Sequence, residues 1–100
     1  MLNLIKLKEK VKFHKQFSPQ ILYVSPDLKV PLICLEAQQE IPPHPSGTGV
    51  FCFLDGKGVM IVDNKEISVS PGEVVMVPEG SKRGIKASEN LVAIAFHVNS

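Results

Sequence analysis

Short runs in which apolar and polar residues alternate with a period of two follow one another along the whole chain. Such alternation is typical of strands with one buried face, and no long stretch keeps apolar residues at helical spacing. The runs that we interpret as strands cover residues 5–13, 20–24, 30–36, 50–54, 58–62, 66–69, 74–77 and 91–98, and a further strand is expected after Gly80. Roughly eight or nine short strands at regular spacing predict an all-β domain, built as a sandwich or barrel.

Turn residues separate these runs. Residues 38–49, QQEIPPHPSGTG, are rich in proline and glycine and predict a loop. Asp55-Gly56 between two apolar runs predicts a hairpin, and Asp63-Asn64 predicts a second tight hairpin. Pro71-Gly72 suits the middle of a type II turn, because glycine accepts the positive φ that this turn requires.

Length and charge limit the function classes. One hundred residues suffice for one hydrophobic core, so we expect a single domain over residues 1–100. The net charge of +1 gives no electrostatic argument for a nucleic acid or an anionic membrane as partner. No apolar run reaches the roughly 20 residues that cross a bilayer, and the start lacks the apolar stretch of a secretory signal. We therefore expect a cytoplasmic protein that binds neither nucleic acid nor membrane.

Lysines are concentrated at the start of the chain. Residues 1–35 carry six lysines against two acidic residues, whereas residues 36–79 carry seven acidic residues against two lysines. We interpret residues 1–16 as an N-terminal strand region whose lysines form a solvated face or protect a strand edge. Cys34 and Cys52 each lie in an apolar run without the paired spacing of a zinc or redox motif, which indicates buried free thiols.

Three segments, CLEAQQEIPPH, FLDGKG and PGEVVMVPEG, resemble in order and spacing the small single-domain cupins. The resemblance covers nearly the whole chain from about Phe17. It implies a cupin-type double-stranded β-helix, or jelly-roll barrel, which agrees with the strand count. It also implies a homodimer, with N-terminal strands pairing across the subunits because short exposed edges otherwise need protection.

The metal-binding motifs of the cupin family are degenerate in this chain. In the family pattern, three histidines and a glutamate converge on one divalent metal inside the barrel. His44 matches the first histidine, but Ser46 stands at the second, Gly49 at the glutamate and Arg83 at the third, although the loop from His44 to Gly49 is one residue short and allows a shifted alignment. The framework is kept by Gly56, Gly72, Pro78 and Gly80. Because a guanidinium is no metal ligand and repels a cation, we expect no metal and no other cofactor, with His44 as the only remnant.

Arg83 has two interpretations. If it points inward, it places a fixed cation in an apolar pocket, which suits a carboxylate or phosphate on a mostly apolar small molecule. The apolar lining would then come from Phe51 or Phe53, Met60 and Met76. Alternatively, Arg83 is a hydrated rim residue beside Lys82 and Lys86, and the Phe and Met side chains only fill the core.

The histidines also leave alternatives open. His44 is either a hydrogen-bond donor or base at the mouth of the barrel, or a loop imidazole without a further task. His97 alternates with Phe96 and Val98 and so lies on the face opposite them, but the sequence does not fix which face is inside. A metal site made by His44 and His97 lacks a visible third ligand.

These observations favour a small-molecule-binding cupin domain without a complete metal site, working alone or as a sensor for an anionic or sugar-like ligand. The candidate ligand-binding residues are Arg83, His44, Phe51, Phe53, Met60, Met76 and His97. One alternative is a cupin isomerase, lyase or oxygenase with an atypical metal set or a metal-free acid–base site that uses His44. Another is an interaction domain with a filled, dry barrel.

Overall fold

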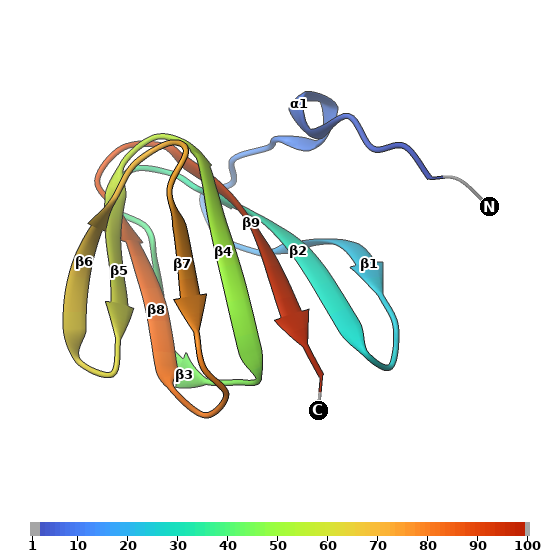
Figure 1. Cartoon of the computed structure of the whole chain (residues 1–100). Helices are drawn as coiled ribbons and strands as arrows, with labels where there is room; N and C mark the ends of the chain where they lie inside the picture. Colours follow the sequence, from blue (N-terminus) through green and yellow to red (C-terminus); the bar gives the residue numbers. More distant parts are fainter. Residues whose placement is uncertain (1–2, 100) are drawn as a thin grey trace.

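Two antiparallel sheets pack face to face in the computed structural model, which describes residues 3–99 (Figure 1). The five-stranded sheet has the order β1 (Gln20–Val24), β2 (Leu28–Leu35), β9 (Leu91–Val98), β4 (Thr48–Asp55) and β7 (Val74–Val77). The four-stranded sheet has the order β3 (Glu40–Pro45), β8 (Lys82–Ala87), β5 (Gly58–Val62) and β6 (Lys65–Val69). The all-β prediction and the jelly-roll architecture are confirmed. Within the described residues no helix is long and apolar enough to span a bilayer.

The predicted turns are confirmed in two of three cases. Asp63 and Asn64 adopt φ values of 49° and 67° between the paired strands β5 and β6, as a tight hairpin turn requires. Gly72 has a φ of 88° in a turn closed by a hydrogen bond from Glu73 N to Ser70 O. The hairpin predicted at Asp55-Gly56 was wrong, because β4 and β5 lie in different sheets and this turn carries the chain between them.

Strand β3 lies where the sequence predicts a loop. Its prolines, Pro42, Pro43 and Pro45, have no N–H to donate, but β3 is an edge strand that pairs only with β8. Prolines are tolerated at sheet edges, and the pairing register shifts between Ile41 and His44, where Pro42 and Pro43 lie. The strand matters for the site because it places His44 opposite Arg83 of β8.

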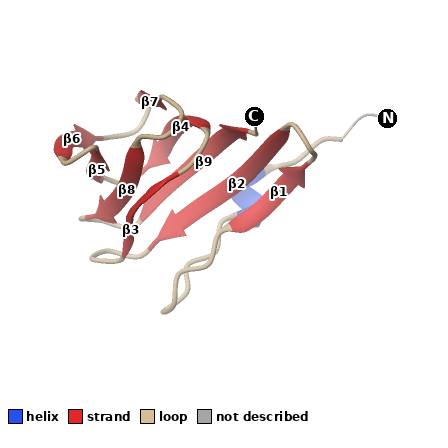
Figure 2. Ribbon diagram, turned by 90° about the horizontal axis from the view of Figure 1, so that it is seen from below, coloured by secondary structure: helices blue, strands red, loops and turns tan. Residues whose placement is uncertain are grey.

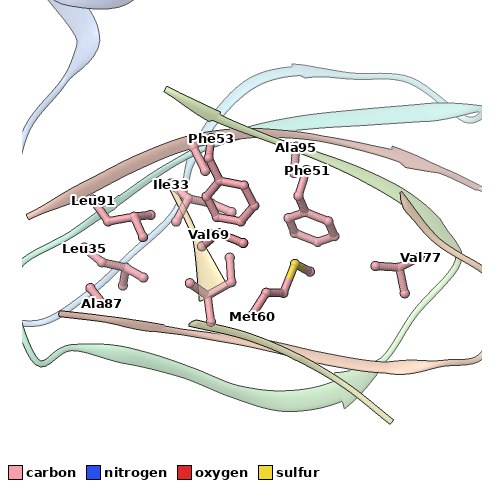
Figure 3. Packing of buried hydrophobic residues seen from close by; sticks show 12 residues of the cluster. Ile33, Leu35, Phe51, Phe53, Met60, Val69, Val77, Ala87, Leu91 and Ala95 are labelled. Carbon is pink, nitrogen blue, oxygen red and sulfur yellow. The ribbon is translucent and has the colours of Figure 1, made fainter. Parts of the chain in front are cut away.

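The main hydrophobic core lies between the sheets. It contains Phe51 and Phe53 of β4 and Met60 of β5, each less than 5% exposed (Figure 3). Strand β9 presents Leu91 and the small side chains of Ala93 and Ala95 to this core. Its other large apolar residues point to the opposite, outer face of the five-stranded sheet, where Val92 and Ile94 belong to a second apolar cluster.

The N-terminal segment packs on this outer face. Leu7–Lys10 forms a single helical turn, α1, so the strand expected within residues 1–16 was wrong; residues 1 and 2 lie outside the described part (Figure 2). Leu7, Val11 and Phe13 pack against a cluster made by Leu32, Cys34 and Val92. The lysines of the segment are exposed, in agreement with the solvated face that the sequence predicts. Both cysteines are free, Cys34 buried and Cys52 half-buried.

Candidate functional site

A cavity of about 160 Å³ opens between β1–β2 and β3–β8. Strands β1 and β2 extend past the edge strand β3 (Figures 1 and 2). Its walls are mostly apolar and include Ile33, Phe51 and Ile85 from the core. The polar groups that line it are the side chains of Lys29, His44, Arg83 and His97, together with backbone. Among residues 3–99 no acidic side chain lines this cavity, so its electrostatic character is positive.

Arg83 points inward, and the alternative of a hydrated rim arginine was wrong. The side chain is 2% exposed, and its guanidinium donates hydrogen bonds to four backbone carbonyl oxygens. Nη1 contacts O of Gly47 at 2.6 Å; Nη2 contacts O of Ser46 at 3.2 Å, Pro78 at 3.2 Å and Ser81 at 2.9 Å; Nε contacts O of Ser81 at 3.1 Å. Arg83 therefore ties the β3–β4 turn to the β7–β8 turn. Burial lowers the pKa of the guanidinium, and the charge of Asp63 opposes this, but an arginine remains protonated in proteins.

Gly49 leaves the space that the guanidinium occupies. A Cβ atom at this position would lie 2.9 Å from Nη1 of Arg83 and 3.0 Å from Cε1 of Phe51, closer than side chains normally pack. Counted back from Gly56, Gly49 stands at the glutamate of the family pattern, and Arg83 stands at its third histidine. The substitutions at positions 49 and 83 are thus sterically coupled. Arg83 fits because position 49 carries no side chain.

His97 faces the interior, whereas Phe96 and Val98 face the outside of the sheet. Its ring meets that of Phe51 edge-on, with the centroids 5.4 Å apart. Among residues 3–99, its buried Nδ1 has no hydrogen-bond partner. Burial lowers the pKa of His97, and the charges of Arg83 and Lys29 lower it further, so the imidazole is neutral at neutral pH. A neutral ring with an unpaired buried nitrogen can donate to or accept from a ligand, depending on its tautomer.

His44 and Lys29 lie at the mouth of the cavity, both with exposed side chains. His44 pairs across the sheet with Arg83, and its Nδ1 lies 3.1 Å from O of Pro42. Lys29 was not predicted as a site residue. Side chains two residues apart on a strand point to the same face, and Lys29 precedes the cavity-lining residues Pro31 and Ile33 by two and four positions. This spacing could have identified Lys29 as a site residue.

Three candidate residues lie away from the cavity, so their prediction as pocket lining was wrong. Phe53 and Met60 are deep in the core, with 1% and 0% exposure. Met76 is 73% exposed on the outer face of β7, because Val75 and Val77 take the inward positions of that strand. The structure therefore brings together Arg83, His97, His44 and Phe51, and Lys29 lines the same cavity.

The described residues do not fit the divalent metal of the family pattern. Within residues 3–99 no group of three or more His, Cys, Asp or Glu side chains is arranged to hold a metal ion. The two histidines that line the cavity share it with a guanidinium, whose charge opposes a cation.

Comparison with known proteins identifies the family. Residues 31–99 match the family model described as the cupin domain, and the chain therefore belongs to the cupin family. No curated protein sequence matches it.

Solved structures share the fold at low identity. A conserved protein of unknown function from Streptococcus pyogenes has a TM-score of 0.88 at 22% identity, covering 100% of this chain and 90% of the other. A cupin superfamily protein from Desulfitobacterium hafniense has a TM-score of 0.88 at 17% identity, covering 100% and 94%. A salicylate 1,2-dioxygenase from Pseudaminobacter salicylatoxidans has a TM-score of 0.68 at 21% identity, covering 74% of this chain but 22% of the enzyme. At these identities the likeness establishes the fold alone.

Proposed function

We propose that this cupin domain binds a small organic anion, a carboxylate on an apolar body of about one ring, in the cavity beside Arg83 and His97. The observation that carries the proposal is the buried Nδ1 of His97, which lacks a partner within the described residues. Leaving a buried polar atom unpaired costs about 1–3 kcal/mol. A bound oxygen atom at this place would remove that cost.

The charges of the cavity favour an anion. Nη1 of Arg83 donates one described hydrogen bond, to Gly47 O, which leaves its second N–H available. Lys29 adds a second positive charge at the mouth, and no acidic side chain in the described part of the chain lines the walls. A carboxylate could accept from His97 and from one of these cations while its apolar part contacts Phe51 and Ile33.

The size and lining limit the kind of molecule. The cavity volume of about 160 Å³ is close to the roughly 150 Å³ of an engineered apolar cavity in another protein that binds benzene. A sugar of similar size would bring several hydroxyl groups against Ile and Phe side chains that cannot hydrogen-bond with them. The cavity therefore supports a compact carboxylate better than a neutral sugar.

The proposal can be tested by following backbone amide resonances of the protein during titration with benzoate and with benzamide, its neutral analogue. We expect benzoate to shift the amides of Phe51, Gly84 and His97 and to bind at least about tenfold more tightly than benzamide. Lys29→Gln and His97→Phe should weaken benzoate binding. His14→Gln removes an exposed histidine that does not line the cavity and should leave binding unchanged.

Two results would refute this function. One is that neither benzoate nor cyclohexanecarboxylate shifts the cavity amides up to its solubility limit. The other is that benzamide binds as well as benzoate, because the fixed charge would then have no role. Elemental analysis of protein from metal-replete medium distinguishes the binding function from the enzyme alternative. A content of about one equivalent of Fe, Mn, Ni, Cu or Zn per chain would favour a metalloenzyme.

A further inference from the structure

The chain ahead of β1 reaches both faces of the five-stranded sheet. Leu7, Val11 and Phe13 pack on the outer face. Phe17 packs instead against the main core between the sheets, and it lines the ligand cavity together with Pro19. The chain therefore crosses from the outer to the inner side of the sheet between Phe13 and Phe17. Figure 2 shows this connection as a long loop between α1 and β1.

The side chain of Gln39 holds this crossing. Its Nε2 donates hydrogen bonds to the backbone O of His14 at 2.6 Å and to that of Lys15 at 2.8 Å. Its Oε1 accepts a hydrogen bond from N of Glu36 at 2.8 Å. A carboxamide offers two N–H donors and one carbonyl oxygen. Both donors of Gln39 thus bind the crossing chain, and the oxygen binds its own turn.

The turn that carries Gln39 is itself fixed. It joins β2 to β3, which belong to different sheets. Its backbone exchanges two hydrogen bonds with Ala87 of β8, at 2.9 and 3.0 Å. A third bond, of 2.9 Å, runs from N of Ala37 to Oδ1 of Asn90. Gln39 is therefore a fixed point of attachment for the crossing chain.

The crossing chain has few other attachments. Within the described residues, no backbone–backbone hydrogen bond joins residues 7–19 to a strand. One further side-chain bond, from Nε2 of Gln20 to O of Lys10, is exposed and 3.2 Å long. Phe17 is only half-buried. A segment with few backbone hydrogen bonds and little buried apolar surface opens locally at a small cost in free energy, so we expect residues 7–19 to open without unfolding the sheets.

We infer that residues 7–19 form a strap that closes the ligand cavity, that Gln39 is the positioning residue that holds it closed, and that ligand binding and strap closure are coupled. The coupling rests on the proposed ligand site, of which Phe17 is a wall. A ligand that touches Phe17 has this contact only while the strap is closed, so it favours the closed form. The closed strap also covers the apolar cluster on the outer face. Occupancy of the cavity thus controls the exposure of an apolar surface on the far side of the sheet.

Limited proteolysis with trypsin tests the inference, because the Lys15–Gln16 bond lies where Gln39 holds the strap. Cleavage follows the population of the open form when the segment recloses faster than it is cut. Gln39→Glu keeps the acceptor for N of Glu36 but replaces the donor by a carboxylate oxygen, which repels the two carbonyl oxygens of the strap. We expect cleavage after Lys15 to be at least about tenfold faster in this variant.

Gln38→Glu is the matched control. It adds the same charge at the neighbouring position, where the side chain is exposed, and it should be cleaved at the wild-type rate. Cleavage after Lys86, within β8, reports global unfolding and should stay slow in both variants. Equal acceleration after Lys15 and Lys86 in Gln39→Glu would overturn the inference, because Gln39 would then hold the whole fold and not the strap.

In the wild-type protein, benzoate should slow cleavage after Lys15. A ligand that binds only the closed form reduces the open population by the factor 1 + [L]/Kd, which is about tenfold at a benzoate concentration of about ten times Kd. A peptide of residues 10–21 should be cleaved at the same rate with and without benzoate, which shows that benzoate does not inhibit trypsin.

The outcomes separate this inference from the proposed function. Benzoate that shifts the cavity amides without slowing cleavage after Lys15 would leave the binding function intact and overturn the coupling. Benzoate that does not shift those amides would refute the binding function and the coupling together. In either case, cleavage of Gln39→Glu at the wild-type rate would overturn the closure of the strap by Gln39.

Discussion

Removing the guanidinium of Arg83 should destabilise the protein strongly, even in the absence of a ligand. Hydrogen bonds from a charged donor contribute about 1.5–3 kcal/mol each. Ser46 and Pro78 are exposed, so water can replace the guanidinium at their carbonyl oxygens. Gly47 and Ser81 are half-buried, and their bonds to Arg83, at 2.6 and 2.9 Å, are replaced less well. Two such bonds, less the recovered cost of burying the charge, give a loss of about 3 kcal/mol for Arg83→Ala.

This loss is a large part of the roughly 5–15 kcal/mol by which such domains are stable. At about 4–8 °C for each kcal/mol in a domain of this size, the midpoint of thermal unfolding should fall by about 15 °C. Urea denaturation and calorimetry measure both quantities. Arg83→Lys should lose nearly as much as Arg83→Ala, because an ammonium cannot span the two turns as the planar guanidinium does. Lys82→Ala, on the same strand but exposed, should change stability by less than about 0.5 kcal/mol.

A free energy of unfolding of Arg83→Ala within about 0.5 kcal/mol of the wild type would show that the two turns are held without the guanidinium. Full stability of Arg83→Lys would show that charge alone suffices. Either result would mean that the hydrogen bonds of Arg83 do not stabilise the two turns.

Two further predictions concern the neighbours of Arg83. Gly49→Ala should destabilise the protein by about 1–3 kcal/mol because its Cβ would crowd Nη1 of Arg83 and the Phe51 ring. The loss of stability should be smaller in a protein that also carries Arg83→Ala. Equal losses in both backgrounds, measured by urea denaturation in a double-mutant cycle, would contradict the steric coupling. The folded state lowers the pKa of His97, so below the ordinary histidine pKa of about 6.5 the unfolded chain binds a proton that the folded chain does not. The His97 contribution should therefore be fully present above that pH and decline as the pH falls towards the lowered pKa. His97→Phe should flatten this dependence of the unfolding free energy on pH, whereas an unchanged slope would contradict it.

Much of the fold could be predicted from the sequence because strand alternation and turn chemistry are local signals. The hairpin at Asp63-Asn64 needs positive φ values that these residue types tolerate, and the structure has them. Strand β3 could not be predicted in the same way. Its prolines are acceptable only because the strand lies at a sheet edge, and edge position is a property of the whole topology.

The direction of side chains was harder to predict where both faces of a strand are apolar. Strand β7 reads Val-Val-Met-Val, which contains no polar residue to mark the outer face, and Met76 was wrongly expected inside. In β9, Leu91, Ala93, Ala95 and His97 point inward, whereas Val92, Ile94 and Phe96 point outward. From Val92 onward, a pattern of size alone would suggest the reverse, because large apolar residues usually fill the core.

The inward position of Arg83 depends on groups that the sequence does not identify. Its hydrogen-bond partners are backbone carbonyl oxygens of two turns, which any residue type could supply. The glycine at position 49 was visible, but its steric role emerges only when Arg83 and Phe51 are seen beside it. The sequence therefore indicated a lost metal site and could not decide between a buried and a hydrated arginine.

The structural and electrostatic roles of Arg83 support each other. Because the carbonyl oxygens of the two turns fix the guanidinium in advance, a ligand that meets its remaining N–H needs no reordering of the side chain. The same positive charge helps to keep His97 neutral, which leaves the Nδ1 of a buried ring free to pair with an incoming group. A negatively charged ligand would then favour protonation of His97 and raise its pKa. Carboxylate affinity should consequently increase as the pH falls through the range in which His97 titrates, while the stability of the ligand-free protein decreases.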